Sequence, residues 1–247
     1  MKNLKFVAVT GLLAFGAFCI SQGESAKGAA PAYKVVEVKG GGSIAGTVKF
    51  EGAIPKPKML KVNKDQKTCG HGQKESEQLV VNGESMGIKD VVVSLEGITE
   101  GKAPAEGAPA LDQKGCVFIP HVLAVSAGSE VELLNSDNVM HNLHSWSIRN
   151  PAFNEGVSGN GSMTKKFELP ELVKITCDVH KWMSSFVVVK ENPYFAVSDE
   201  NGMFKIDNIP AGTYKVEAWQ EKLGKRKSDV TVKSGEETVV DFVFKKK

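Results

Sequence analysis

Short apolar runs separated by turn residues dominate the sequence and restrict the folds open to it. From about residue 43 onward, runs rich in Val, Ile, Leu and Phe are interrupted roughly every eight to twelve residues by Gly, Pro, Asn or Asp, and no apolar stripe of helical period is sustained. This pattern is typical of β-strands joined by tight turns, so we predict an all-β protein. Hydrophobic residues make up 41% of the 247 residues, which is enough for a sizeable core in one or two domains.

The first residues have the features of an export signal. Lys2 and Lys5 form a basic start, residues 6–20 are apolar, and Ser21-Gln22-Gly23 supplies small residues for cleavage. The apolar run is shorter than the roughly 20 residues that cross a bilayer, so we predict a cleaved signal over residues 1–23 and no membrane span in the mature protein. We therefore expect a periplasmic or secreted protein in an oxidising compartment.

The overall charge excludes partners that are recognised by a strong electrostatic field. The chain has 31 basic and 29 acidic residues, and residues 1–23 carry two lysines and no acidic residue. Without residues 1–23 the formal net charge is therefore zero. We expect no nucleic-acid partner. The sequence also lacks the Gly-x-Ser-x-Gly, His-Glu-x-x-His and phosphate-loop motifs, and we expect no enzymatic activity.

Composition divides the rest of the chain into segments. After the signal we expect a flexible Gly/Ala-rich tether over residues 24–42, an N-terminal β segment over 43–87, a longer β segment over 88–190 and a C-terminal β segment over 191–247. In the longer segment, we predict a first strand at 90–95. Residues 97–115 are rich in Gly, Ala and Pro and lack periodicity, which predicts an exposed loop.

Two short sequence motifs carry candidate metal ligands. His141-Asn142 follows an apolar strand, and Cys177-Asp178-Val179-His180-Lys181-Trp182-Met183 places a cysteine at a strand end and then a tight loop. One thiolate and two imidazoles with a distant thioether suit copper, because soft sulfur favours Cu(I) and imidazole accepts Cu(II). Zinc sites more often use paired cysteines, and an Fe–S cluster needs more cysteines than the mature chain has.

These phrases resemble the cupredoxins, the small blue copper proteins, and the loop Cys177-x-x-His180-x-x-Met183 is most similar to that of the amicyanin-like members. The resemblance covers about residues 116–190. It implies a Greek-key β-sandwich with one type 1 copper ion whose ligands are His141, Cys177, His180 and Met183. It also implies that Asn142 hydrogen-bonds toward the cysteine loop and holds the two ligand segments together.

The same resemblance implies how redox protein partners would dock. In that family the loop histidine is the ligand nearest solvent, so the edge of His180 is the expected docking face. Met140, Trp146, Lys181 and Trp182 are the candidate rim residues.

The remaining cysteines and histidines are assigned only after this resemblance. With Cys177 given to copper, Cys69 and Cys116 remain, and we predict a disulfide between them. The alternative is a second metal site at Cys69 and His71. His144 lies on the same strand face as Asn142 and is either a fifth ligand or a structural residue, and we expect His121 to be structural.

The C-terminal segment resembles another family. Residues 195–218 follow the pattern strand, Gly turn, strand, Pro-Gly turn, strand, and are very similar to the carboxypeptidase-regulatory-like, transthyretin-like β-sandwich. Residues 42–52 resemble the opening strand of the same kind of module. We therefore expect both ends to form one sandwich with the copper segment inserted in it or packed against it. The expected fold class is all-β: a cupredoxin Greek-key β-sandwich with additional Ig-like or transthyretin-like β-sandwich segments.

Two functions remain open at this point. The first is an exported type 1 copper protein that transfers single electrons between redox partners. The alternative is an envelope copper-binding or structural β-sandwich scaffold without an electron-transfer role. Catalysis at an open copper position is disfavoured, because Met183 would fill the position that a substrate needs.

Overall fold

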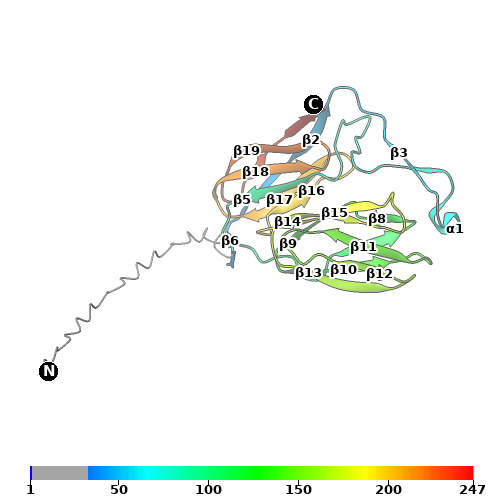
Figure 1. The fold of residues 1–247 in the computed structure, drawn as a ribbon. Coiled ribbons are helices and arrows are strands. Elements are labelled where there is room, and N and C mark those ends of the chain that lie inside the picture. The colour runs from blue at the N-terminus through cyan, green and yellow to red at the C-terminus, as the bar shows by residue number, and fades with distance from the viewer. Residues whose placement is uncertain (2–32, 247) are drawn as a thin grey trace. The chain divides into compact units, whose positions relative to one another are not determined.

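The computed structural model describes Met1 and residues 33–246, which form an almost entirely β structure (Figure 1). The described residues contain one short helix, α1 at Gln66–Cys69. This helix is not long and apolar enough to cross a membrane. The all-β prediction is confirmed. The predicted signal beyond Met1 and residues 24–32 of the predicted tether lie outside the described residues.

Both ends of the described chain build one β-sandwich, which we call the terminal sandwich. Its strands are β2 (Gly42–Glu51), β5 (Val92–Glu96), β16 (Phe195–Val197), β17 (Met203–Ile209), β18 (Gly212–Gln220), β19 (Gly224–Val232), β20 (Glu237–Val239) and β21 (Phe242–Lys245). One sheet has the order β17-β2-β20, with β21 also paired to β2, and the other has the order β16-β5-β18-β19. This pairing confirms that the two ends share one sandwich.

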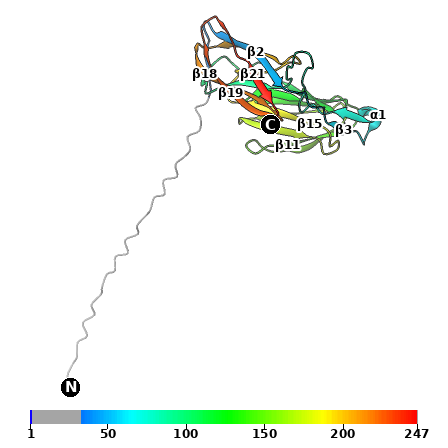
Figure 2. The same ribbon diagram turned by 90° about the horizontal axis from the view of Figure 1, so that it is seen from above.

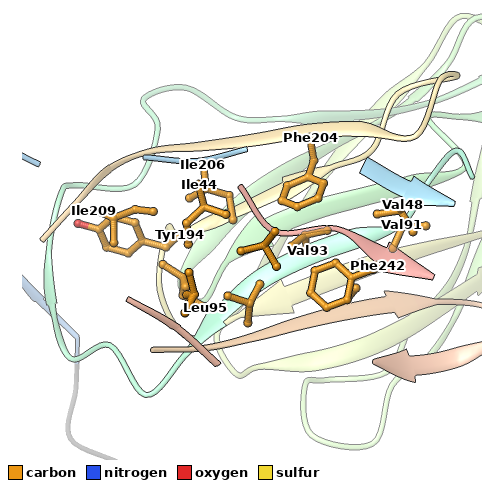
Figure 3. Packing of buried hydrophobic residues seen from close by; sticks show 14 of the residues in the cluster. Ile44, Val48, Val91, Val93, Leu95, Tyr194, Phe204, Ile206, Ile209 and Phe242 are labelled. Atoms are coloured by element: carbon orange, nitrogen blue, oxygen red, sulfur yellow. The ribbon is translucent and has the colours of Figure 1, made fainter. Parts of the chain in front are cut away.

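Alternating side chains fill the space between these two sheets. In β2, Ile44, Val48 and Phe50 are buried, and in β21 Phe242 and Phe244 are buried while the residue between them is exposed. They pack against the inward-facing residues of β5, β17, β18 and β19 in one hydrophobic cluster (Figure 3). The period of two is the reason why this sequence forms half-buried strands rather than helices.

The middle of the chain forms another β-sandwich, the central sandwich. Its strands are β7 (Ala110–Lys114), β8 (Val117–Ile119), β9 (Val122–Ser126), β10 (Ser129–Asn135), β11 (His141–Trp146), β12 (Asn154–Val157), β13 (Ser162–Phe167), β14 (Glu171–Thr176) and β15 (Ser184–Lys190). They make two sheets with the orders β13-β10-β7-β8 and β12-β11-β14-β15-β9. A separate hydrophobic cluster fills this sandwich.

The two sandwiches share a small apolar contact and a buried polar pair. Val92 and Trp219 of the terminal sandwich pack against Val122 and Val188 of the central sandwich. Beside this contact, His121 Nε2 lies 2.8 Å from a carboxylate oxygen of Glu221, and both side chains are buried. His121 thus lies in a buried pair between the two sandwiches and belongs to none of the groups of candidate metal ligands among the described residues.

A hairpin-like arm leaves the terminal sandwich after β2 and reaches one end of the central sandwich (Figures 1 and 2). We call residues 59–75 the arm. It consists of β3 (Met59–Lys61), α1 and β4 (Gln73–Glu75), and β3 pairs with β4 in antiparallel fashion. These residues were predicted to belong to an N-terminal β segment, and no sequence pattern indicates that they cross to the other sandwich.

Several expectations for strand placement are corrected by the strand pairing. The strand expected at 90–95 as the start of the copper segment is β5, which pairs with β16 and β18 of the terminal sandwich. Val93 and Leu95 face one hydrophobic cluster, Val92 faces another and Ser94 is buried as well, so β5 is buried on both faces and its pattern does not reveal its sheet.

The predicted loop and tether also contain strands. Residues 97–115 include β6 (Glu100–Gly101) and β7, and β7 pairs with β10 within a sheet and buries Leu111. Residues 33–42 of the predicted tether include β1 (Lys34–Val35), which pairs with β6. Gly and Pro on either side of these short strands obscured a weak alternating pattern.

The turn between β11 and β12 is held by one carboxylate of the central sandwich. Glu171 accepts hydrogen bonds from the Ser147 hydroxyl, from the backbone N–H groups of residues 148–150 and from the Asn150 side chain, at 2.5 to 3.1 Å. Burial alone would raise the pKa of Glu171, but these donors stabilise the ionised form and lower the pKa from 4.5 to about 2.

Glu171→Gln should therefore destabilise the protein in a pH-dependent way. A pKa depressed to about 2 gives stability that is fully present above pH 4.5 and is lost as the pH falls through about 2. We expect a loss of about 2 kcal/mol at neutral pH, after a reduction for partial solvent exposure. Urea unfolding of the variant and of Glu132→Gln, an exposed control on β10, would measure it. A Glu171→Gln deficit that does not shrink in acid would contradict this account.

Candidate metal centre

Two neighbouring strands bring the candidate ligands to the same end of the central sandwich. His141 is the first residue of β11, and Cys177 directly follows the last residue of β14, the antiparallel neighbour of β11. A tight loop then leads to β15, closed by a hydrogen bond from the Met183 N–H to the His180 carbonyl at 2.9 Å. His141, Cys177, His180 and Met183 are all at most 2% exposed.

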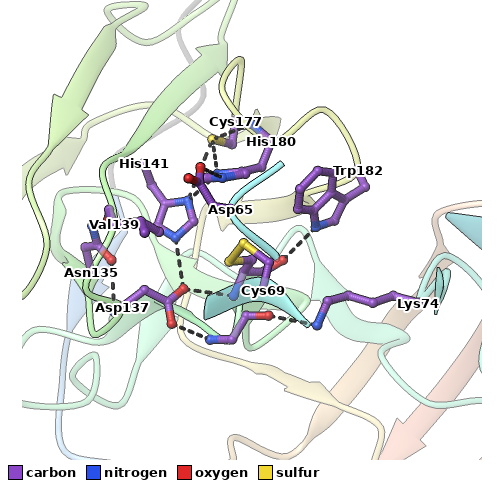
Figure 4. The surroundings of a disulfide bond; sticks show 12 residues. Asp65, Cys69, Lys74, Asn135, Asp137, Val139, His141, Cys177, His180 and Trp182 are labelled. Atoms are coloured by element: carbon purple, nitrogen blue, oxygen red, sulfur yellow. Dashed lines mark hydrogen bonds and ion pairs between the residues drawn. A yellow bond between two sulfur atoms is a disulfide. The ribbon is translucent and has the colours of Figure 1, made fainter. Parts of the chain in front are cut away.

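Three candidate ligand atoms surround one point. The Nδ1 atoms of His141 and His180 are 2.8 Å apart, and Cys177 Sγ lies 3.9 Å from the first and 3.8 Å from the second (Figure 4). The point equidistant from these three atoms is about 2.1 Å from each, which is close to a metal–imidazole bond length. The three groups thus fit a single metal ion. Met183, in the same loop, is also buried.

Asn142 holds the cysteine loop in place. Its Oδ1 accepts hydrogen bonds from the backbone N–H groups of Asp178 and Val179, at 2.7 and 3.3 Å, and lies 3.4 Å from Cys177 Sγ. Its Nδ2 donates to Asn154 at 2.6 Å. One side chain on β11 therefore connects the histidine strand with the loop that carries the other ligands.

The surroundings shift the pKa values of all three groups. Burial raises the pKa of the Cys177 thiol, but contacts with His141 and the backbone N–H of His180 outweigh burial and lower the pKa overall. Burial lowers the pKa of His180, and this effect exceeds the opposing influence of Asp65. The pKa of His141 is raised, because Cys177 and Asp137 together outweigh its burial.

Each imidazole has a carboxylate on its outer side, and neither carboxylate was among the residues predicted from the sequence. Asp137 Oδ2 lies 2.9 Å from His141 Nε2, and Asp65 Oδ2 lies 2.8 Å from His180 Nε2. Asp137 is itself fixed by the backbone N–H groups of Gly115 and Cys116 at 2.7 and 2.8 Å. Its position four residues before His141 is a signal that could have been used, whereas nothing in the sequence connects Asp65 with His180.

The predicted disulfide is present and ties the arm to the central sandwich. Cys69 of α1 and Cys116 are bonded across a sequence separation of 47 residues, and both are buried. The alternative metal site at Cys69 and His71 is therefore wrong, because the Cys69 sulfur is bonded. The arm also donates from Lys74 Nζ to the Gly115 carbonyl at 2.8 Å.

The arm overturns the expectation that His180 is the ligand nearest solvent. His180 is 0% exposed, because Asp65 and the arm cover its outer edge. Among the expected rim residues, Met140 and Trp146 are 58% and 56% exposed, whereas Trp182 is only partly exposed and donates to the Cys116 carbonyl.

His144 lies outside the cluster of three ligand atoms. Its Nδ1 is 3.1 Å from Asp178 Oδ2, and its ring stacks on Trp146 with the centroids 4.3 Å apart. Two other groups of candidate ligand atoms in the described part of the chain both include a sulfur of the disulfide, so they offer no free thiolate. The group of His141, Cys177 and His180 is the one that remains.

Comparisons with known proteins match only parts of the chain. The family described as "Polysaccharide lyase family 4, domain II" matches residues 160–240, which is less than half of the chain. No curated protein matches.

Several solved structures are similar to part of the chain. The Cu-containing nitrite reductase NirK from Thermus scotoductus SA-01 has 22% identity and a TM-score of 0.33. The match covers 37% of this chain and 24% of the nitrite reductase chain. A purple cupredoxin from Nitrosopumilus maritimus has 21% identity and a TM-score of 0.30, over 33% of this chain and 99% of the cupredoxin. A reduced Cu(I) form of an amicyanin mutant has 20% identity and a TM-score of 0.32, over 40% of this chain and 98% of amicyanin. None of these similarities assigns a function to this chain.

Removal of the disulfide should destabilise the metal-free protein. Replacing both Cys69 and Cys116 with Ala releases a loop closed over a separation of 47 residues, and we expect the free energy of unfolding to fall by about 4 kcal/mol. Urea unfolding of the oxidised wild type and of the double variant would measure the difference. An unchanged midpoint would show that the arm is held without the disulfide.

Proposed function

We propose that this chain binds one copper ion at His141, Cys177, His180 and Met183 and acts as an exported type 1 copper protein that transfers single electrons between redox partner proteins. The observation that carries the proposal is the triangle of Cys177 Sγ and two imidazole Nδ1 atoms, with edges of 2.8, 3.8 and 3.9 Å. A thiolate and two imidazoles with a weak axial thioether are the ligand set of blue copper sites.

The donor set and its burial support copper in this role. A copper ion bound there would supply one-electron redox chemistry. The chain would supply a buried thiolate, two imidazoles already facing each other and a thioether from the same loop. Because the donors are assembled by two paired strands and by Asn142, they need little movement when the charge of the ion changes.

Export and redox partners are part of the proposal. Residues 1–23 have the composition of a cleavable signal, and the Cys69–Cys116 disulfide suits an oxidising compartment outside the cytoplasm. Met140 and Trp146 are exposed apolar side chains on or beside β11, the strand that carries His141. They lie at opposite ends of this strand, and exposed apolar side chains of this kind suit the brief, weak docking of redox partners.

A second candidate function is favoured by one observation. The arm covers His180 completely, so the site could hold copper without passing electrons at this edge. The protein would then be an envelope copper-binding or structural scaffold. The rate of electron exchange separates this function from the first.

Absorption and electron paramagnetic resonance spectroscopy of the Cu(II)-loaded protein would test the site. We expect an intense thiolate-to-copper band and narrow copper hyperfine splitting, both lost in Cys177→Ser and both retained in His144→Ala, because His144 lies outside the triangle. Nuclear magnetic resonance line broadening in mixtures of the Cu(I) and Cu(II) forms would then measure electron exchange.

The outcomes separate the two functions. A blue site with fast exchange would support the electron carrier, and a blue site with exchange too slow to broaden the lines would favour the scaffold. Copper bound equally well without Cys177 would overturn the proposed site.

A further inference from the structure

His180 is held from two sides by different parts of the chain. Its Nδ1 faces His141 Nδ1 at 2.8 Å and Cys177 Sγ at 3.8 Å, whereas its Nε2 lies 2.8 Å from Asp65 Oδ2. The two residues are 115 positions apart in the sequence. A segment that leaves the terminal sandwich thus reaches into the candidate metal centre of the central sandwich.

The contact with Asp65 decides which nitrogen of His180 can bind a metal. A neutral imidazole carries one proton, and the nitrogen without it is the one that can ligate. The Asp65 carboxylate can only accept a hydrogen bond, so it favours the tautomer with the proton on Nε2. That tautomer leaves the lone pair of Nδ1 pointing toward His141 and Cys177.

The arm holds Asp65 in an unusual backbone conformation. Asp65 has φ 46° and ψ 40°, a left-handed conformation that costs energy for a residue with a side chain. Four residues later the disulfide joins Cys69 to Cys116, and Lys74 Nζ donates to the Gly115 carbonyl at 2.8 Å. Both attachments follow Asp65 in the chain, one at the last residue of α1 and one on β4, and β4 pairs with β3 on the other side of α1, so the position of Asp65 is set by the arm as a whole (Figure 4).

Asp65 also completes a symmetric arrangement around the ligands. Asp137 lies behind His141 at 2.9 Å as Asp65 lies behind His180 at 2.8 Å. Two carboxylates and one thiolate then surround the position of a bound cation. Such anionic surroundings stabilise Cu(II) more than Cu(I), because the ion of higher charge interacts more strongly with them.

We propose that Asp65 is a positioning residue of the metal centre, which orients His180 for ligation through Nδ1, excludes solvent from its outer edge and favours the oxidised ion. This inference rests on the proposed function for its copper-dependent part. The orientation of His180 is a property of the metal-free protein as well, and it can be measured without copper.

Two substitutions test this role, with a matched control. Asp65→Asn keeps the size of the side chain and removes its charge, and Asn tolerates the left-handed conformation. Asp65→Gly removes the whole side chain and accepts the same φ without strain, which protects against a failure to fold. Glu75→Gln is the control, because Glu75 is an exposed carboxylate on β4 of the same arm.

The first readout is the tautomer of His180 in the metal-free protein, from its ring nitrogen chemical shifts. We expect the Nε2–H tautomer in the wild type and in Glu75→Gln, and a mixture of tautomers in Asp65→Gly. An identical tautomer in the wild type and in Asp65→Gly would overturn the positioning role, whether or not the protein binds copper.

The second readout is the binding and reduction of copper. We expect the affinity for Cu(II) to fall about 10- to 100-fold in Asp65→Gly, with a smaller loss in Asp65→Asn. The loss should be greater for Cu(II) than for Cu(I), so the reduction potential should rise by about 59 mV for each tenfold difference between the two losses.

The copper results also separate failure of this inference from failure of the proposed function. A wild-type protein without a thiolate–copper band would end the proposed function, and the tautomer would still decide the role of Asp65. A wild-type blue site whose Cu(II) affinity and potential are the same in Asp65→Gly would overturn the inference and leave the copper site intact.

Discussion

The close approach of two imidazole nitrogens to one thiol sulfur is the constraint on which the rest of this structure depends. Three polar groups that are at most 2% exposed can be stable at separations of 2.8 to 3.9 Å only if each also has a hydrogen-bond partner outside the group. Asp137 holds His141, Asp65 holds His180, and the backbone N–H of His180 contacts Cys177 Sγ. The cost of burying these groups is thereby offset by hydrogen bonds that also aim them at one point.

Residues from outside the central sandwich complete this arrangement. The pairing of β11 with β14 in the central sandwich places His141 beside the end of the strand that leads to Cys177. The terminal sandwich supplies the arm, and the arm supplies Asp65 and one half of the disulfide. The contact of Val92 and Trp219 with Val122 and Val188, next to the His121–Glu221 pair, joins the two sandwiches. The arm that follows β2 of the terminal sandwich thus contributes directly to the candidate metal centre.

The parts of the site that sequence reasoning predicted are those encoded locally. Cys177, His180 and Met183 lie in one short loop, and His141-Asn142 is a compact phrase, so spacing and residue type were sufficient. Asp65 could not be predicted, because its contact with His180 depends on how the arm crosses between sandwiches. The fold follows the same rule. Alternation revealed the β class, but β5 is buried on both faces and was assigned to the wrong sandwich, and β7 lies in a stretch rich in Gly and Pro and was predicted to be part of a loop.

X-ray absorption spectroscopy at the copper edge of the loaded protein tests the central claim most directly, because it counts and identifies the atoms around the ion. Our account predicts two imidazole nitrogens at about 2.0 Å and one short sulfur at about 2.3 Å, taking zinc-site bond lengths as a guide. A shell made only of nitrogen and oxygen atoms would contradict it, because the ion would then be bound away from Cys177 and the triangle of ligand atoms would not be the metal site.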